Sequence, residues 1–149
     1  MLPNSDYRDL FAELNAAGAR YLLVGAHALA FHGRPRFTKD LDVWVEASDE
    51  NAPRVVAGLL AFGAPAEMVR LEDFEKPGLI LQLGVAPNRI DVTTTLDGLT
   101  FAEAWPGRAM TAYGDQNVPV IGLDDFARNK RSTGRLRDLA DLEDLGLEP

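Results

Sequence analysis

The residues from Tyr21 to Val45 most constrain what this chain can fold into. They contain an apolar run, Tyr21–Val24, then a break at Gly25-Ala26, a short apolar segment and a second run that carries Asp40 and Asp42. Successive side chains of a strand point to opposite faces, so the two carboxylates would share one face of a strand. The apolar residues that alternate with them would form the other face, which predicts that this strand packs on a core.

Holding Asp40 and Asp42 two residues apart on a strand brings two negative charges together. Two unit charges about 4 Å apart repel by roughly 1 kcal/mol in water and by roughly 4 kcal/mol at an effective dielectric of about 20. A chain that fixes such a pair on a rigid strand is expected to place a cation between the two side chains. The alternative is a solvated strand face without a ligand.

Length and composition narrow the class of protein. The 149 residues predict one domain covering 1–149, and the absence of cysteine excludes disulfides and thiolate metal sites but not a hard cation held by oxygen atoms. A net charge of −8 argues against a surface that grips nucleic acid as a whole, although five of the 15 Lys and Arg residues fall within 128–137. No apolar run approaches the roughly 20 residues of a membrane span, and the first ten residues do not resemble a secretory signal. We therefore expect no membrane partner and a cytoplasmic location.

A second acidic strand face follows later in the chain. In the run Arg89–Thr94, Ile90 and Val92 would face one way, whereas Arg89, Asp91 and Thr93 would face the other. The preceding apolar run and the Pro87-Asn88 turn signal predict a hairpin with this strand. Because hairpins interrupt the alternation of strands and helices, we predict an α+β fold with a mixed β-sheet flanked by helices.

Hydrophobic periodicity, together with capping residues, glycine and proline at the ends of segments, predicts the other helices and strands. Expected helices run from a cap at Ser5 or Asp6 to Gly18, Ala26 to His32, Asp49 to Gly63, Phe101 to Trp105, Asp125 to Ser132 after a cap at Asp124, and Leu136 to Leu145. Expected strands, besides those above, are Leu79 to Val85, Met110 to Tyr113 and Val118 to Ile121. The segment from Glu67 to Gly78 reads as polar and irregular.

The acidic residues and the glycine turn suggest one kind of chemistry. Three carboxylates on neighbouring strands can hold two divalent ions about 3.5–4 Å apart. Mg²⁺ prefers oxygen ligands, and phosphoryl transfer depends mainly on neutralising charge and positioning the reactants. The chain contains no GxxxxGK[ST], GxGxxG, HExxH or GxSxG motif, which excludes several other enzyme classes.

Together these motifs resemble the nucleotidyltransferases of the DNA polymerase beta superfamily, most closely small bacterial stand-alone members related to abortive-infection (AbiEii-type) toxins. The resemblance covers the chain from about Tyr21 to Leu145, including a C-terminal helical segment of about 123–145. The matching motifs are Val24-Gly25-Ala26, His32-Gly33 with Arg36, Asp40-Leu41-Asp42, Arg89-Ile90-Asp91, Leu123-Asp124-Asp125, Asn129-Lys130-Arg131 and the run Arg137 to Leu142.

The resemblance implies a role for each matching acid. Asp40 and Asp42 would hold both metal ions or the one on the nucleotide side, and Asp91 would complete the second metal site and help deprotonate the acceptor hydroxyl. The implied cofactor is Mg²⁺ in a two-metal site, with Mn²⁺ as a substitute. The implied reaction transfers NMP from an NTP to a hydroxyl of an RNA such as tRNA, or of a protein, within a toxin–antitoxin system that has a cognate partner protein.

The resemblance also implies contacts to the nucleotide. Gly25 and Ala26 would meet its phosphates through the backbone, and Arg36 and Lys130 are candidate contacts to the triphosphate. The family usually has Gly-Gly or Gly-Ser at the position of Gly25-Ala26, so a hydroxyl contact is missing here. This departure motivates an alternative function, a non-catalytic nucleotide-binding or antitoxin-like partner protein.

Other polar and aromatic residues leave two interpretations open. The basic residues of 130–137 could bind a ligand or form a solvated helix face paired with nearby Asp residues. Trp44 could stack on a base or simply cover the sheet, and His27 and His32 more often pack than bind on so short an apolar helix.

Overall fold

A single mixed sheet forms the centre of the computed structural model, which describes residues 4–33, 40–84 and 88–148. The strand order is β3-β4-β2-β1-β6-β5, with β1/β6 and β2/β4 parallel and the other neighbouring pairs antiparallel. The strands are β1 Tyr21–Val24, β2 Asp40–Val45, β3 Ile80–Leu83, β4 Arg89–Thr93, β5 Ala109–Tyr113 and β6 Gln116–Val120. The predicted mixed sheet and the β3–β4 hairpin are confirmed.

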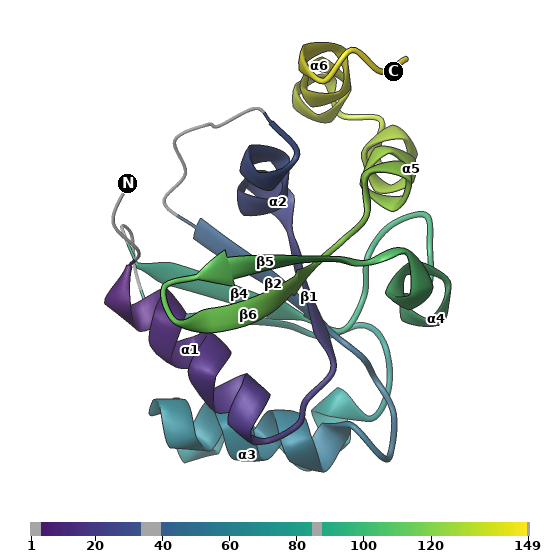
Figure 1. The fold of residues 1–149 in the computed structure, drawn as a ribbon. Coiled ribbons are helices and arrows are strands. Elements are labelled where there is room, and N and C mark those ends of the chain that lie inside the picture. The colour runs from purple at the N-terminus through teal and green to yellow at the C-terminus, as the bar shows by residue number, and fades with distance from the viewer. Residues whose placement is uncertain (1–3, 34–39, 85–87, 149) are drawn as a thin grey trace.

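Helices cover both faces of this sheet, as expected for the predicted α+β class (Figure 1). In that view α1 and α3 lie below the sheet, whereas α2, α5 and α6 lie above it. The helices are α1 Ser5–Ala16, α2 Gly25–Phe31, α3 Ala52–Phe62, α4 Phe101–Ala104, α5 Leu123–Thr133 and α6 Leu136–Asp144. Within the described residues, none of them is both long and apolar enough to cross a bilayer.

The core lies between the sheet and the helix pair α1 and α3. Strand β1 lies between β2 and β6, and all four of its residues are buried, as its continuous apolar run predicts. Leu10 and Phe11 of α1 and Leu59 of α3 are fully buried against it. Burying a side chain of this kind contributes about 1.5–3 kcal/mol, so this layer holds β1 and β2 in place.

The caps of α1 and α5 differ from the sequence prediction. Asn4, not Ser5 or Asp6, caps α1: its side-chain oxygen accepts the N–H groups of Asp6 at 2.9 Å and Tyr7 at 3.2 Å. Asn is as good a cap as Ser or Asp, so composition does not distinguish them. Gly122 precedes α5, and Asp124 instead lies in the first turn, where a negative charge meets the positive end of the helix dipole.

The segment from Glu67 to Gly78 is more ordered than its polar sequence predicts. It contains two short 3₁₀ helices, η1 Ala66–Met68 and η2 Leu71–Phe74. Phe74 is fully buried in the core, which anchors the segment beside α3. A third 3₁₀ turn, η3 Trp105–Gly107, follows directly on α4.

Candidate active site

Parallel pairing of β2 and β4 brings the predicted acids together. Asp42 lies opposite Asp91 in the register, and Asp40 lies opposite Arg89. Neighbouring strands are about 4.7–4.9 Å apart, and residues opposite each other in a parallel pair point to the same side of the sheet. Three acids from two separate parts of the chain therefore share one end of one sheet face.

Asp42 has a strongly shifted pKa. Burial raises its pKa to about 6, and the neighbouring charges of Asp91 and Asp40 act in the same direction. Lys130 and Arg89 lower the pKa but do not compensate for these effects. At neutral pH the Asp42 carboxylate therefore lacks sufficient positive charge around it, as expected at a position that receives a cation from outside.

Gly25 makes the close approach of β1 to Asp42 possible. Its φ of 71° lies in the left-handed region, which favours glycine. A Cβ atom at this position would overlap the Oδ2 atom of Asp42. The glycine predicted from the sequence to admit a phosphate is therefore also required by its contact with the acid strand.

Arg89 lies at the acids but was not among the predicted site residues. Its guanidinium donates to both oxygens of Asp91, at 3.0 and 2.9 Å, and lies 3.9 Å from an oxygen of Asp40. The signal in the sequence was the spacing Arg-x-Asp, which places both side chains on one face of β4. Arg89 is thus a counter-ion of Asp91 and lies near Asp40, and its side chain is 35% exposed.

The donor chemistry fits a hard divalent ion, but the arrangement is not that of a finished metal site. Within the described ranges, no three acidic or histidine side chains are already grouped as a ligand set. Asp91 uses both of its oxygens on Arg89. Carboxylates are the oxygen ligands that Mg²⁺ prefers, so Asp40, Asp42 and Asp91 could hold the ion once Arg89 releases Asp91.

Lys130 lies on α5 near the acids but is already paired. It is 8% exposed, and its Nζ lies 2.9 Å from Asp138 and 3.9 Å from Asp141. Burial would raise the pKa of Asp138, but hydrogen bonds from Thr133 and Lys130 outweigh it and hold the pKa at about 2. The pairing with nearby Asp residues considered for Lys130 is therefore present, but it is buried and not solvated, and it joins α6 to α5.

Two adjoining hollows of about 300 and 270 Å³ lie over the acids. We call them together the acid cleft; both are lined by Gly25, Asp42, Lys130 and Arg135. Their size is at or just below the lower end of small-molecule pockets, roughly 300–1,000 Å³. The cleft thus leaves room for an ion and part of a ligand beside the acids.

The remaining predicted residues lie elsewhere. Ala26 lines the second hollow, whereas Arg36 falls outside the described residues. Trp44 is 1% exposed and packs edge-on against Phe101, so its ring is not a free stacking surface. His32 contacts the carbonyl of Ile121 at 2.8 Å and does not line the acid cleft.

Comparisons with known proteins support the fold through structure only. No protein-family model matches the chain, and no curated protein matches its sequence. The structure is similar to that of TM1012 from Thermotoga maritima, a proposed nucleotidyltransferase, with a TM-score of 0.60 and 14% sequence identity. The match covers 93% of this chain and 88% of the other. The predicted nucleotidyltransferase fold is thereby confirmed.

Proposed function

We propose that this chain is a nucleotidyltransferase that moves NMP from an NTP to a hydroxyl acceptor with the help of Mg²⁺. The observation that carries the proposal is the register of β2 and β4, which places Asp42 opposite Asp91. Asp40 lies two residues before Asp42 on β2 and on the same face of the sheet. Burial and the charges of Asp91 and Asp40 raise the pKa of Asp42 to about 6, so a cation beside this carboxylate would stabilise its ionised form. A fold shared with a proposed nucleotidyltransferase is consistent with this chemistry.

The residues of the acid cleft have separate tasks in the proposed reaction. Asp40, Asp42 and Asp91 would hold Mg²⁺, which when bound would neutralise charge on the triphosphate. Asp91 would also take the proton of the attacking hydroxyl, whose oxygen forms a bond to the α-phosphorus as pyrophosphate leaves. Gly25 and Ala26 would meet the phosphates through their backbone N–H groups, while the missing side chain of Gly25 leaves the space that the Asp42 carboxylate occupies.

Transfer of label from each α-³²P-labelled NTP tests the proposal. The protein is incubated with Mg²⁺, bulk tRNA and cell protein, and label is followed on both acceptor classes. We expect label on one class with the wild type and a loss of at least about 100-fold with Asp91→Asn, the scale of removing a catalytic proton acceptor. The absence of label on every acceptor with folded wild-type protein would contradict the proposal.

The Arg89–Asp91 pair favours a second function, a non-catalytic nucleotide-binding or antitoxin-like partner. A guanidinium that keeps both oxygens of Asp91 would block one metal ligand permanently. In that case nucleotide binds without transfer of label, and size-exclusion chromatography with the product of a neighbouring gene shows a tight complex. Label transfer that Arg89→Gln leaves intact or increases favours the enzyme.

The finer assignments depend on the sequence resemblance alone. They are an RNA or protein acceptor, a place in a cytoplasmic toxin–antitoxin pair, and a contact from Lys130 to the triphosphate. For Lys130 the structure adds one condition, because its ammonium would have to serve Asp138 and the ligand together. The labelling experiment above distinguishes the acceptor classes directly.

A further inference from the structure

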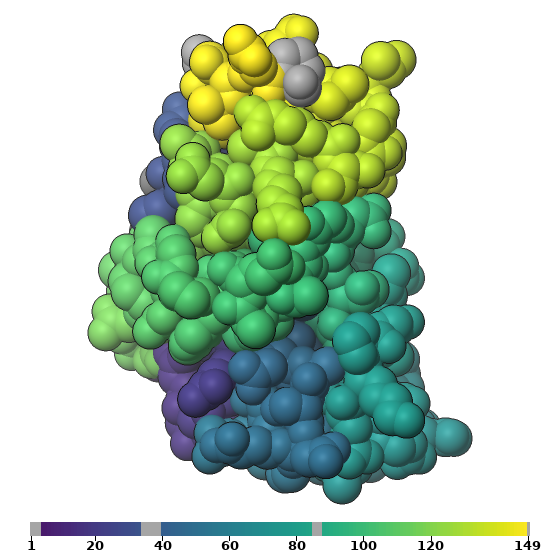
Figure 2. Space-filling model, turned by 90° about the vertical axis from the view of Figure 1, so that its right-hand side faces the viewer, coloured from purple at the N-terminus to yellow at the C-terminus, as the bar shows by residue number. Residues whose placement is uncertain are grey.

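The two hollows of the acid cleft differ in the charged side chains that line them. Both touch Lys130 and Arg135, but only the smaller one, of about 270 Å³, also touches Arg137 and Asp138 at the start of α6. Helices α5 and α6 follow each other along the chain and lie at one end of the molecule, yellow-green to yellow in Figure 2. Among the described residues, the basic side chains that line the cleft therefore come from α5, α6 and the residue between them.

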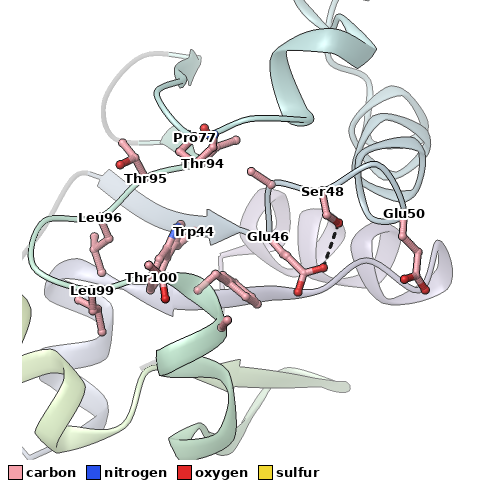
Figure 3. A pocket seen from close by; sticks show the side chains of 13 residues that line it. Trp44, Glu46, Ser48, Glu50, Pro77, Thr94, Thr95, Leu96, Leu99 and Thr100 are labelled. Atoms are coloured by element: carbon pink, nitrogen blue, oxygen red, sulfur yellow. Dashed lines mark hydrogen bonds between the residues drawn. The ribbon is translucent and has the colours of Figure 1, made fainter.

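The largest cavity in the described part of the chain does not suit an anion. It measures about 490 Å³ and shares Thr95 and Leu96 with the larger hollow of the cleft (Figure 3). Glu46 and Glu50 line this cavity, whereas no Lys or Arg does so within the described ranges. Like charges repel, so phosphate groups are better accommodated beside the basic side chains of the smaller hollow.

Asp138 fixes the side chain of Lys130. The Lys130 Nζ atom lies 2.9 Å from one oxygen of this carboxylate. The other oxygen contacts Thr133 Oγ1 at 2.6 Å and Arg135 Nε at 2.7 Å. Asp138 is 3% exposed, so three partners and its burial hold the carboxylate itself in place. Because both hollows touch Lys130, this contact keeps the ammonium at the wall of the cleft.

The position of Lys130 matters to the cleft. Its charge lowers the pKa of Asp42, although burial of Asp42 has the larger and opposite effect. An ammonium has three N–H donors, and Asp138 accepts one of them. Asp141 lies 3.9 Å from the same ammonium but lines neither hollow. Without Asp138, the nearest acidic partner of Lys130 among the described residues would therefore lie outside the cleft.

Arg137 is the second charged residue in the first turn of α6. It is exposed and lines the smaller hollow, and no described residue forms an ion pair with it. A guanidinium group matches the geometry of phosphate oxygens and keeps its charge at any ordinary pH. Arg131 on α5 differs, because it donates to the carbonyl of Glu148 and lines neither hollow.

We propose that the first turn of α6 completes the phosphate side of the acid cleft, with Asp138 as the positioning residue of Lys130 and Arg137 as a direct contact to the phosphates. The inference rests on the proposed function for the identity of the ligand, a nucleoside triphosphate. In this arrangement Asp138 does not need to touch the nucleotide, because it acts by keeping the ammonium of Lys130 at the cleft wall.

A lysine NMR signal reads the position of Lys130 directly. The probe is inorganic tripolyphosphate with excess Mg²⁺, because it carries the phosphates without a base. The chain has three lysines, so in protein labelled with ¹³C-lysine the variants Lys39→Arg and Lys76→Arg each remove one ε-methylene signal and identify that of Lys130. We expect tripolyphosphate to move the Lys130 signal and adenosine to leave it in place.

Asp138→Asn separates positioning from simple charge. If Asp138 acted through its charge alone, removing a negative charge near an anion would tighten binding of tripolyphosphate. If it positions Lys130, the variant should bind tripolyphosphate about tenfold more weakly. The Lys130 signal should then no longer respond, while the amide signals of β2 and β4 keep their wild-type positions.

Arg137→Gln tests the direct contact and should weaken binding of tripolyphosphate about fivefold. Arg131→Gln removes the same charge from the same helix pair and is the matched control, with an expected change of less than about twofold. Arg137→Gln alters an exposed side chain, so this comparison and the wild-type Lys130 signal decide the matter even if Asp138→Asn does not fold.

Three results would overturn the proposal. They are a Lys130 signal that tripolyphosphate leaves in place, an Asp138→Asn variant that binds tripolyphosphate at least as tightly as the wild type, and equal effects of Arg137→Gln and Arg131→Gln. None of these readouts depends on transfer of label. Label transfer alongside any of the three results would therefore leave the proposed function standing, whereas the expected binding without label transfer would contradict the proposed enzyme and not the phosphate site.

Discussion

Replacing Asp42 by Asn should stabilise the metal-free protein at neutral pH, although it removes a residue of the proposed metal site. Burial and the charges of Asp91 and Asp40 raise the pKa of Asp42 from 3.8 to about 6. As the pH rises above about 4, the unfolded chain releases this proton first, whereas the folded protein keeps it until about pH 6. The free energy of unfolding therefore falls between about pH 4 and pH 6 and stays low above that range.

The size of the effect follows from the difference between the two pKa values. At about 1.36 kcal/mol for each pKa unit, the rise from 3.8 to about 6 corresponds to ~3 kcal/mol. For a chain of about this length, each 1 kcal/mol changes the melting temperature by roughly 2–4 °C. Asp42→Asn carries no charge, so it should melt up to roughly 6–12 °C above the wild type at pH 8 and at about the same temperature at pH 4.

Thermal unfolding in EDTA, followed by circular dichroism from pH 4 to pH 8, measures this difference. Asp73→Asn, at an exposed position on η2, is the control and should stay within about 0.5 kcal/mol of the wild type at every pH. A variant at Asp42 that melts at or below the wild-type temperature at pH 8 would refute the reasoning. A gain that persists unchanged at pH 4 would assign the effect to packing and not to charge.

Three further changes test other parts of the site. Gly25→Ala should destabilise the protein by more than the ~1–2 kcal/mol that a left-handed backbone costs an alanine, because the new Cβ would also meet the Asp42 carboxylate. Gly18→Ala is the control in the same melting assay, because Gly18 has nearly the same φ and no atom near its Cβ position, so it measures the backbone strain alone. Arg89→Gln should lower the melting temperature of the metal-free protein, because Asp91 would lose its ion pair. In a melting titration the variant should reach half-saturation at a lower Mg²⁺ concentration than the wild type. An unchanged Mg²⁺ dependence would show that Arg89 does not compete with the ion. Lys130→Met should cost about 1.5–3 kcal/mol in denaturant unfolding, because Asp138 would lose its lysine but keep Arg135 and Thr133. A loss below about 0.5 kcal/mol would show that the pair is not structural.

Alternation along the strands is the part of the site that local sequence could specify. Alternation places Asp40 and Asp42 on one face of their strand and Leu41 and Val43 on the other. In the same way it places Asp91 on one face of its strand and Ile90 and Val92 on the other. The glycine break after Val24 was equally visible. These features depend on neighbouring residues only, so period and turn chemistry are enough to find them.

Pairing between distant segments could not be read in the same way. The sequence did not indicate that Asp42 would lie opposite Asp91, because register depends on which strands become neighbours. The burial of Lys130 beside Asp138 likewise depends on the contact of α5 with α6.

The central claim is that Asp40, Asp42 and Asp91 meet around divalent ions at one end of the sheet. Mn²⁺ has an oxygen preference similar to that of Mg²⁺ and broadens NMR signals of nuclei close to it, so an amide spectrum recorded during Mn²⁺ titration tests the claim most directly. We predict that broadening begins at the amides of β2 and β4 around Asp42 and Asp91, and that Asp40→Asn/Asp42→Asn abolishes it at the same Mn²⁺ concentration. Broadening that centres on another part of the chain, or that the double variant leaves unchanged, would contradict the account.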